Sequence, residues 1–170
     1  QGYSDQLLTE FASKTAPERL WKGAFQQWAN SKVTSHFAER RTYVIGGKPV
    51  SQATHFGYDL ATTRGAPITA ANSGRVLYAG DLGIYGNCVI VDHGMGVATL
   101  YGHLSSFGVK PGDAVEKNSV LGRSGDTGLA GGDHLHFAVL LGDAYVDPVE
   151  WWDEKWVREK IDAQLAPPAP

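Results

Sequence analysis

Hydrophobic positions change their spacing along the chain, and the spacing near the start is helical. Leu7, Leu8 and Phe11 predict a first helix, and Thr15–Glu18 has the form of a capping box that would begin a second. Apolar residues then recur every three or four positions, at Leu20, Trp21, Ala24, Phe25 and Trp28. That period indicates one buried helical face. We expect residues 1–34 to form a helical segment packed on the main domain; the alternative is a docking or regulatory segment.

From about residue 40 the apolar runs become short, and glycine or proline recurs between them. Short apolar runs separated by such turn signals are typical of β-strands. The runs cover residues 43–45, 68–71, 75–79, 88–91, 97–101, 109–112, 115 and 120–122. This pattern, together with the 21 glycines in the chain, predicts an all-β sandwich or barrel rather than a helical bundle.

The end of the chain returns to a helical pattern. Asp147 can cap a helix, and Pro148 suits its first position. Trp152 and Trp156 lie four residues apart, as neighbours on one helical face do. We expect residues 153–170 to comprise a C-terminal helix and a loose proline-rich tail.

Composition narrows the possible partners. A chain of 170 residues suits one compact domain with its own core. The net charge is −3 and no large basic cluster occurs, which argues against a nucleic-acid partner and against electrostatic attachment to anionic lipid. The single cysteine, Cys88, excludes an intramolecular disulfide and a cysteine zinc cluster. Because Cys88 lies in an apolar run, we interpret it as packing rather than a reactive thiol.

The chain contains no run of 18 apolar residues and no signal-peptide pattern. Its abrupt start leads us to expect a processed form or an expressed fragment. Any membrane attachment would then depend on a segment absent from this chain. We expect a monomer.

Two histidines alternate at the head of an apolar run, in His134-Leu135-His136. Alternate side chains of a strand share one face. We therefore expect the two imidazoles to lie side by side while Leu135 turns into the core. An isolated pair of this kind is more often a chance pair of surface histidines, so its meaning depends on the rest of the chain.

A second group could complete a metal site with this pair. His55 and Asp59 are of the types that bind zinc, and Gly57 between them lets the backbone bend so that both side chains reach one ion. Two histidines and one aspartate would leave one position for water, which is the ligand count of a catalytic zinc. His103 ends a predicted strand, where catalytic side chains are often displayed.

These pieces, in this order, resemble the lysostaphin and LytM-like family of zinc metallopeptidases that act on peptidoglycan. The resemblance runs from about Ser35 to Trp151. It includes His55-Phe56-Gly57-Tyr58-Asp59-Leu60-Ala61, Gly65-Ala66-Pro67-Ile68, Gly74-Arg75-Val76, Gly86-Asn87-Cys88-Val89-Ile90-Val91-Asp92-His93-Gly94, Tyr101-Gly102-His103-Leu104-Ser105, Gly122-Arg123-Ser124-Gly125-Asp126-Thr127-Gly128, His134-Leu135-His136-Phe137 and Val146-Asp147-Pro148. The combination is specific, although no single piece is.

The resemblance implies His55, Asp59 and His136 as ligands of one zinc ion per chain. It implies His103 and His134 as catalytic histidines beside the water on the metal. No H-E-x-x-H helix is present to supply a glutamate base. Because imidazole titrates near neutral pH, the two histidines are candidates to move the proton instead.

For residues 35–152 the resemblance implies a mainly β domain, a compact antiparallel fold related to the barrel-sandwich hybrid (duplicated hybrid motif), with helices at both termini of the chain. It implies the peptide cross-links of bacterial peptidoglycan as substrate and the periplasm or cell envelope as location. Among the possible bonds we favour a D-alanyl cross-link. Tyr43 is a candidate to hydrogen-bond the developing oxyanion.

Two positions depart from the family pattern. Ala38 stands where a glycine is frequent, and Asp133 stands where a proline is common before the histidine pair. Both bear on loop shape rather than on the metal site. Of the remaining histidines, we interpret His93 as a turn residue that supports neighbouring strands and His36 as exposed.

Three alternatives remain open. The first is a catalytically silent module of the same fold that binds wall or activates an amidase, although all five expected positions are filled here. The second is a carrier or phosphotransfer domain; Lys110 and Lys117 lack a carrier motif, and a phosphocarrier has no need of Asp59. The third is a D,D-carboxypeptidase with related zinc geometry, a class that typically spaces its first histidine and aspartate more widely.

Overall fold

The structure is a computed structural model that describes the backbone of residues 2–45 and 48–165 and the side chains of residues 6–39 and 55–165. Its helical elements are α1 (Gly2–Ala12), η1 (Gly83–Tyr85), α2 (Pro148–Trp151), α3 (Glu154–Trp156), η2 (Val157–Ile161) and η3 (Asp162–Gln164). Its strands are β1 (Lys32–Ser35), β2 (Arg40–Ile45), β3 (Lys48–Thr54), β4 (Tyr58–Ala61), β5 (Pro67–Thr69), β6 (Gly74–Asp81), β7 (Asn87–Gly94), β8 (Val97–Phe107), β9 (Ala114–Val115), β10 (Val120–Ser124), β11 (Leu135–Leu141) and β12 (Ala144–Val146).

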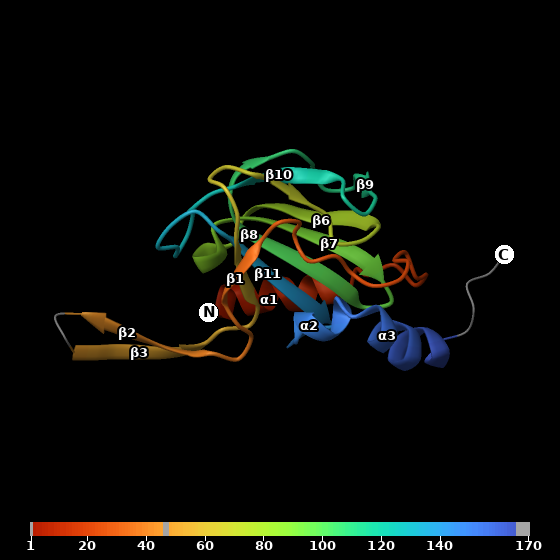
Figure 1. Ribbon diagram of the computed structural model, residues 1–170, viewed down its shortest axis with the longest axis horizontal. Helices are drawn as coiled ribbons and strands as arrows, with labels where there is room; N and C mark the ends of the chain where they lie inside the picture. The colour runs from red at the N-terminus through yellow and green to blue at the C-terminus, as the bar shows by residue number, and fades with distance from the viewer. Residues whose placement is uncertain (1, 46–47, 166–170) are drawn as a thin grey trace.

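Within the described residues, ten strands form one antiparallel sheet and β2 and β3 form a separate hairpin. The main path of the sheet runs β1-β4-β11-β8-β7-β6-β9, while β10 pairs with both β8 and β5, and β12 pairs with β11. Figure 1 shows the β2–β3 hairpin extending away from the body of the molecule. The expected mainly β, antiparallel fold with terminal helices is confirmed. The sheet is open, so the alternative of a closed barrel is wrong.

The central strands β7, β8 and β11 are buried on both faces, and their side chains alternate between two hydrophobic clusters. On one face lie Val89, Val91, Tyr101, Phe137 and Val139. On the other lie Cys88, Ile90, Leu100, Ala138 and Leu140. This division follows from the two-residue repeat of a strand. It also confirms that Cys88 is a buried packing residue.

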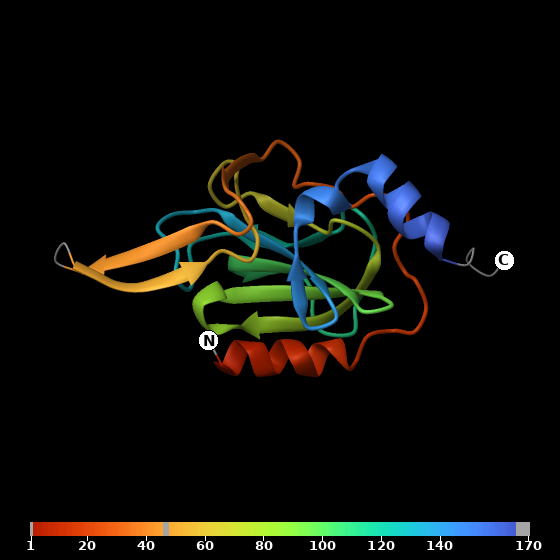
Figure 2. The same ribbon diagram turned by 90° about the horizontal axis from the view of Figure 1, so that it is seen from below.

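Helix α1 covers the second of these faces, as Figure 2 shows. Its Leu8 is buried, and Leu7 and Phe11 pack against the same cluster. The predicted first helix is therefore confirmed. Among the residues that the structure describes, no helix is both long enough and apolar enough to span a membrane.

The second predicted helix, from Thr15, is wrong. Residues 13–31 form turns and irregular backbone, although Trp21, Phe25 and Trp28 are buried as expected. The hydrogen-bond donors at the expected helix start bond to strand β7 instead. The Thr15 hydroxyl and the Ala16 N–H both donate to the carboxylate of Asp92.

Further along the same segment, backbone N–H groups bond to distant carbonyls. Leu20 donates to His93, Phe25 to Trp151 and Gln26 to Ala71. Gly23 adopts a left-handed backbone with φ of 63°, which interrupts any helix. Tertiary hydrogen bonds therefore replace the helical ones. The division at residue 34 stays a prediction, but residues 21–28 share the main core.

The C-terminal prediction is confirmed over the described residues. The Asp147 side chain accepts a hydrogen bond from the Val149 N–H, and Pro148 occupies the first turn of α2. Short helical elements continue from α3 to η3. The proline-rich tail, residues 166–170, lies outside the described residues.

His93 is fully buried at the centre of a polar network. Its Nδ1 lies 2.8 Å from the Ser73 carbonyl, and because a carbonyl can only accept, Nδ1 carries the proton. Nε2 therefore accepts a hydrogen bond from the Thr99 hydroxyl, 2.7 Å away. Thr99 Oγ1 lies 2.9 Å from Tyr101 Oη, which accepts the Ala71 N–H. His93 lies in strand β7 and not in a turn as predicted, but its contacts agree with the expected supporting role. Burial lowers the pKa of His93 to about 4 and raises the pKa of Tyr101 to about 12. Both side chains are therefore neutral at pH 7.

This burial predicts acid sensitivity. The pKa of His93 is about 4 in the folded protein, below its ordinary value of 6.5, so the unfolded chain binds more protons between these values. Stability is therefore lost as pH falls through that window, by about 3 kcal/mol in total. Urea unfolding at pH 7 and pH 4 measures the loss. In a His93→Gln variant, which has no imidazole to titrate at this position, the decrease in unfolding free energy from pH 7 to pH 4 should be smaller by about 3 kcal/mol. An equal decrease in both proteins would contradict the prediction.

Candidate metal centre

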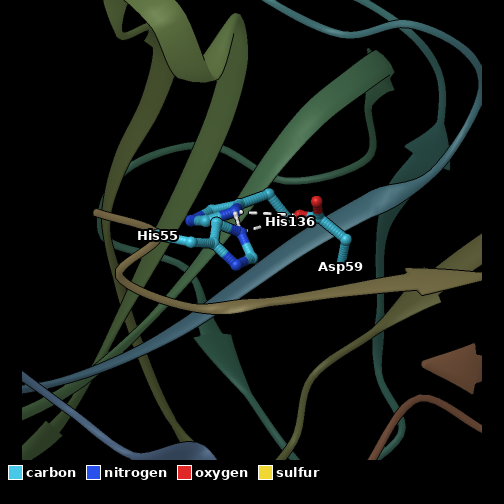
Figure 3. A group of neighbouring side chains, drawn as sticks. All are labelled: His55, Asp59 and His136. Carbon is cyan, nitrogen blue, oxygen red and sulfur yellow. Dashed lines mark hydrogen bonds and ion pairs between the residues drawn. The ribbon is translucent and has the colours of Figure 1, made fainter. Parts of the chain in front are cut away.

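Three side chains from two distant stretches of the chain meet at one end of the sheet. Asp59 lies on β4 and His136 on β11, directly opposite each other in the strand pairing. His55 lies between β3 and β4. All three are buried, with 4–6% of their surface exposed. Figure 3 shows the three side chains pointing toward one another.

The candidate ligand atoms form a small triangle. His55 Nε2 lies 3.1 Å from Asp59 Oδ1 and 3.2 Å from His136 Nδ1, and the third side is 3.2 Å. Ligands about 2.0–2.1 Å from a tetrahedral zinc ion lie roughly 3.3–3.4 Å apart. The spacing and the donor types therefore fit a zinc ion bound by these three residues, with one position for water.

Backbone carbonyls orient the imidazoles around this triangle. His55 Nδ1 lies 2.8 Å from the His36 carbonyl. Because a carbonyl can only accept, Nδ1 carries the proton and Nε2 presents its lone pair toward Asp59. An outer hydrogen bond of this kind fixes the tautomer and the ring orientation of a metal-ligating histidine.

His136 is arranged the other way round, with Nδ1 toward the triangle. Its ring stacks on Tyr85, with centroids 4.9 Å apart and planes at 25°. Its Nε2 is buried and has no hydrogen-bond partner. A neutral ring protonated at Nε2 leaves Nδ1 as the acceptor, which is the form that a metal requires.

Electrostatics favour an ionised Asp59 beside a neutral His136. Burial opposes ionisation of Asp59, but the surrounding imidazoles of His134, His136 and His55 outweigh it and hold the pKa of this carboxyl far below its usual range. Burial lowers the pKa of His136, against the opposing effect of Asp59. Metal ligands must be deprotonated, so both shifts favour the form that binds a cation.

Gly57 permits the close approach of the two halves of the site. A Cβ built at this position would lie 2.4 Å from the Phe137 carbonyl oxygen and 2.9 Å from Cε1 of His136. No side chain fits there without movement of the backbone. The glycine was predicted to allow a bend; what the structure requires of it is the absence of a side chain.

His103 and His134 lie beside the triangle, with ring centroids 4.7 Å apart. His103 Nδ1 lies 2.6 Å from the Thr127 carbonyl, and His134 Nδ1 lies 2.8 Å from the Gly132 carbonyl. Both rings are therefore protonated at Nδ1 when neutral. His134 Nε2 is 3.6 Å from Asp59 Oδ1, which ties the pair to the candidate ligands.

His103 is buried and its backbone is left-handed, with φ of 64°. Non-glycine residues in this region cost of order 1–3 kcal/mol and cluster at functional sites. Burial lowers the pKa of His103 to about 4, although the Thr127 carbonyl opposes the shift. The imidazole is thus neutral at pH 7 and can accept a proton.

An open groove runs past these side chains. It lies between Thr34 and Ser35 of β1 on one side and the loop of residues 129–134 on the other, with Asp59 in its lining. An extended peptide in this groove would pass His134 and Asp59. The groove therefore leads to the candidate metal centre.

The two departures from the family pattern have structural explanations. Asp133 accepts hydrogen bonds from Ser124 Oγ at 2.7 Å and from the Gly65 N–H at 3.1 Å. It thereby anchors the loop that carries His134, so loop shape does not depend on a proline. Ala38 has a left-handed backbone with φ of 65°, the conformation for which glycine is suited.

Ala38→Gly is therefore expected to stabilise the protein. A residue with a side chain costs about 1–2 kcal/mol in the left-handed region, and glycine removes this strain. Glycine also raises the entropy of the unfolded chain, which offsets part of the benefit, so the net gain in stability is about 1 kcal/mol. Urea unfolding of both proteins measures the difference. A lower midpoint for the variant at an unchanged slope would contradict the prediction.

Residue patterns identify the candidate ligands and the two neighbouring histidines but not the groups that orient their rings. These are the carbonyls of His36, Gly132 and Thr127 and the ring of Tyr85. Carbonyl positions have no residue-type signal. His36 itself has an exposed side chain, as expected. The side chain of Tyr43 lies outside the described residues.

Comparison with known proteins identifies the family. The family model for peptidase family M23 matches residues 53–148, more than half of the chain. This chain therefore belongs to peptidase family M23. The resemblance found in the sequence is confirmed.

Individual relatives agree with this membership. The chain is 40% identical over 95 residues to the DD-carboxypeptidase/endopeptidase Mpg of Neisseria meningitidis, covering 56% of this chain but only 22% of that protein. A zinc containing peptidase from Vibrio cholerae superposes with a TM-score of 0.62 at 31% identity, over 77% of this chain and 40% of that one. The catalytic domain of lysostaphin from Staphylococcus simulans gives 0.60 at 30% identity, over 72% and 92%.

Proposed function

We propose that this chain is a zinc-dependent endopeptidase domain that hydrolyses peptide cross-links of bacterial peptidoglycan. One observation carries the proposal: His55, Asp59 and His136 bring three ligand atoms within 3.2 Å of one another in a member of a peptidase family. We assign these residues as ligands of one zinc ion. The zinc containing relative from Vibrio cholerae supports the choice of metal.

The protein residues have distinct tasks in this mechanism. Zinc supplies Lewis-acid chemistry, in which water is activated for attack and a carbonyl is polarised. Neutral His103 and its neighbour His134 take up the proton of the attacking water and deliver it to the leaving amine. The Thr127 and Gly132 carbonyls hold both rings in the tautomer this transfer needs.

The bond we propose is a D-alanyl cross-link, and we place the protein outside the cytoplasm, in the periplasm or cell envelope. The location follows from the proposed substrate, and the name of the Neisseria relative, a DD-carboxypeptidase/endopeptidase, supports the choice of bond. The same name favours a second candidate activity, removal of a terminal D-alanine. The silent-module alternative is disfavoured because all five site positions are filled and converge.

The test is digestion of purified peptidoglycan with and without a chelator, followed by mass spectrometry of the muropeptides. We expect cross-linked dimers to be converted to monomers, with release of new amines that the chelator abolishes. Shortening of monomer stems by one alanine would identify the carboxypeptidase activity. The proposal fails if several wall types release no amine in a chelator-sensitive way.

A further inference from the structure

The turn of residues 35–39 wraps around His55. The His55 N–H donates to the Glu39 carbonyl at 2.8 Å, and the His55 carbonyl accepts from the Ala38 N–H at 2.7 Å. The His55 ring in turn donates from Nδ1 to the His36 carbonyl. Both the backbone and the ring of this residue are therefore held by one short segment.

The Glu39 carboxylate closes that turn from outside. One oxygen accepts from the Ser35 hydroxyl at 2.7 Å. The other accepts from the His36 N–H at 3.0 Å and lies 3.1 Å from His36 Nδ1. Glu39 thus holds the peptide unit that immediately precedes the His36 carbonyl, together with the side chains of Ser35 and His36. The Ser35 hydroxyl also lies 3.3 Å from His55 Nδ1, so it links the Glu39 carboxylate to the His55 ring.

Loss of this brace would act on the direction of the His55 lone pair. The His36 carbonyl sets both the tautomer and the tilt of the ring, and Nε2 points at the triangle only while that carbonyl keeps its place. Groups that orient a metal-ligating histidine in this way typically affect metal affinity by 10–100-fold when removed. Glu39 contacts the turn and not the His55 ring, and its side chain is nearly half exposed. We therefore expect its removal to weaken metal affinity by about tenfold, the lower end of this range.

We propose that Glu39 is a positioning residue for the metal, which acts by holding the turn that aims His55. The inference rests on the proposed function, because it needs His55 to be a ligand. The Glu39 carboxylate contacts Ser35 and His36 and is not itself a candidate ligand.

The test measures zinc affinity by competition with a chromogenic chelator, together with the visible spectrum of the cobalt-substituted protein. Glu39→Ala is expected to weaken zinc binding about tenfold and to change the cobalt bands, which report ligand geometry. Glu39→Gln, which keeps an acceptor for the turn, should recover most of the affinity. The matched control is Glu116→Ala, because it removes an exposed carboxylate from the loop between β9 and β10, and it should bind zinc like the parent.

The outcomes separate the two proposals. If the parent binds no zinc, the proposed function fails and Glu39 has no metal to position. If the parent binds zinc and Glu39→Ala binds it equally well with an unchanged cobalt spectrum, the positioning role is overturned. A lower melting temperature of the metal-free variant without a change in affinity or spectrum also overturns it, because the carboxylate would then only stabilise the fold.

Discussion

Asp59→Ala and His136→Ala are expected to lose both bound zinc and hydrolysis, from about one ion per chain to almost none and from full activity to background. Each removes one of three atoms that lie within 3.2 Å of one another. Asp59 also carries the only negative charge of the triangle, which compensates a divalent cation. Metal analysis of purified protein, together with release of amines from peptidoglycan, measures the two effects.

Matched variants make this result specific. Asp126→Ala removes an exposed carboxylate that is not among the three, and it should keep zinc. Because Asp59 and His136 are buried, circular dichroism of each variant checks that the sheet still forms. Full retention of zinc by a folded His136→Ala protein would overturn the ligand assignment.

His103→Ala is expected to keep zinc and to lose hydrolysis by about 10²–10⁴-fold, the usual contribution of a general acid–base group. The imidazole lies beside His134, with ring centroids 4.7 Å apart, and 6.0 Å from the ring of His136. It does not belong to the triangle of ligand atoms. Proton transfer should therefore fail while the metal stays bound.

Zinc content and turnover on a soluble cross-linked muropeptide, measured on the same preparation, test this separation. The control is Glu116→Ala, whose exposed side chain lies on the loop between β9 and β10 and whose loss should leave turnover near the parent value. Loss of zinc together with activity in His103→Ala would show that His103 acts on the metal site itself. Unchanged turnover would remove it from the mechanism.

Much of this molecule could be predicted from local patterns. A short apolar run before turn residues predicted β7, and the two-residue repeat of a strand predicted that Leu135 points away from His136. The capping residues Asp147 and Pro148 predicted the start of a C-terminal helix correctly. These signals succeed because they depend on neighbours within a few residues, where backbone geometry alone relates one side chain to the next.

Local patterns failed where distant groups compete for the same atoms. Thr15–Glu18 has a proper helix-start motif, yet Asp92 takes the hydrogen bonds that a helix would need, from 76 and 77 residues away in the chain. Propensity is a weak preference that such tertiary contacts override. The same limit applies to Ala38, whose left-handed backbone follows from its contact with His55 and not from its residue type.

The sequence by itself determined which side chains could bind a metal, because residue types at known spacings limit the chemistry. Only the tertiary structure decided how they are presented. The pairing of β4 with β11 sets Asp59 opposite His136, and the backbone carbonyls of His36, Thr127 and Gly132 set the tautomers of His55, His103 and His134. A carbonyl is common to every residue, so its position is a property of the folded backbone and is not encoded in any single letter.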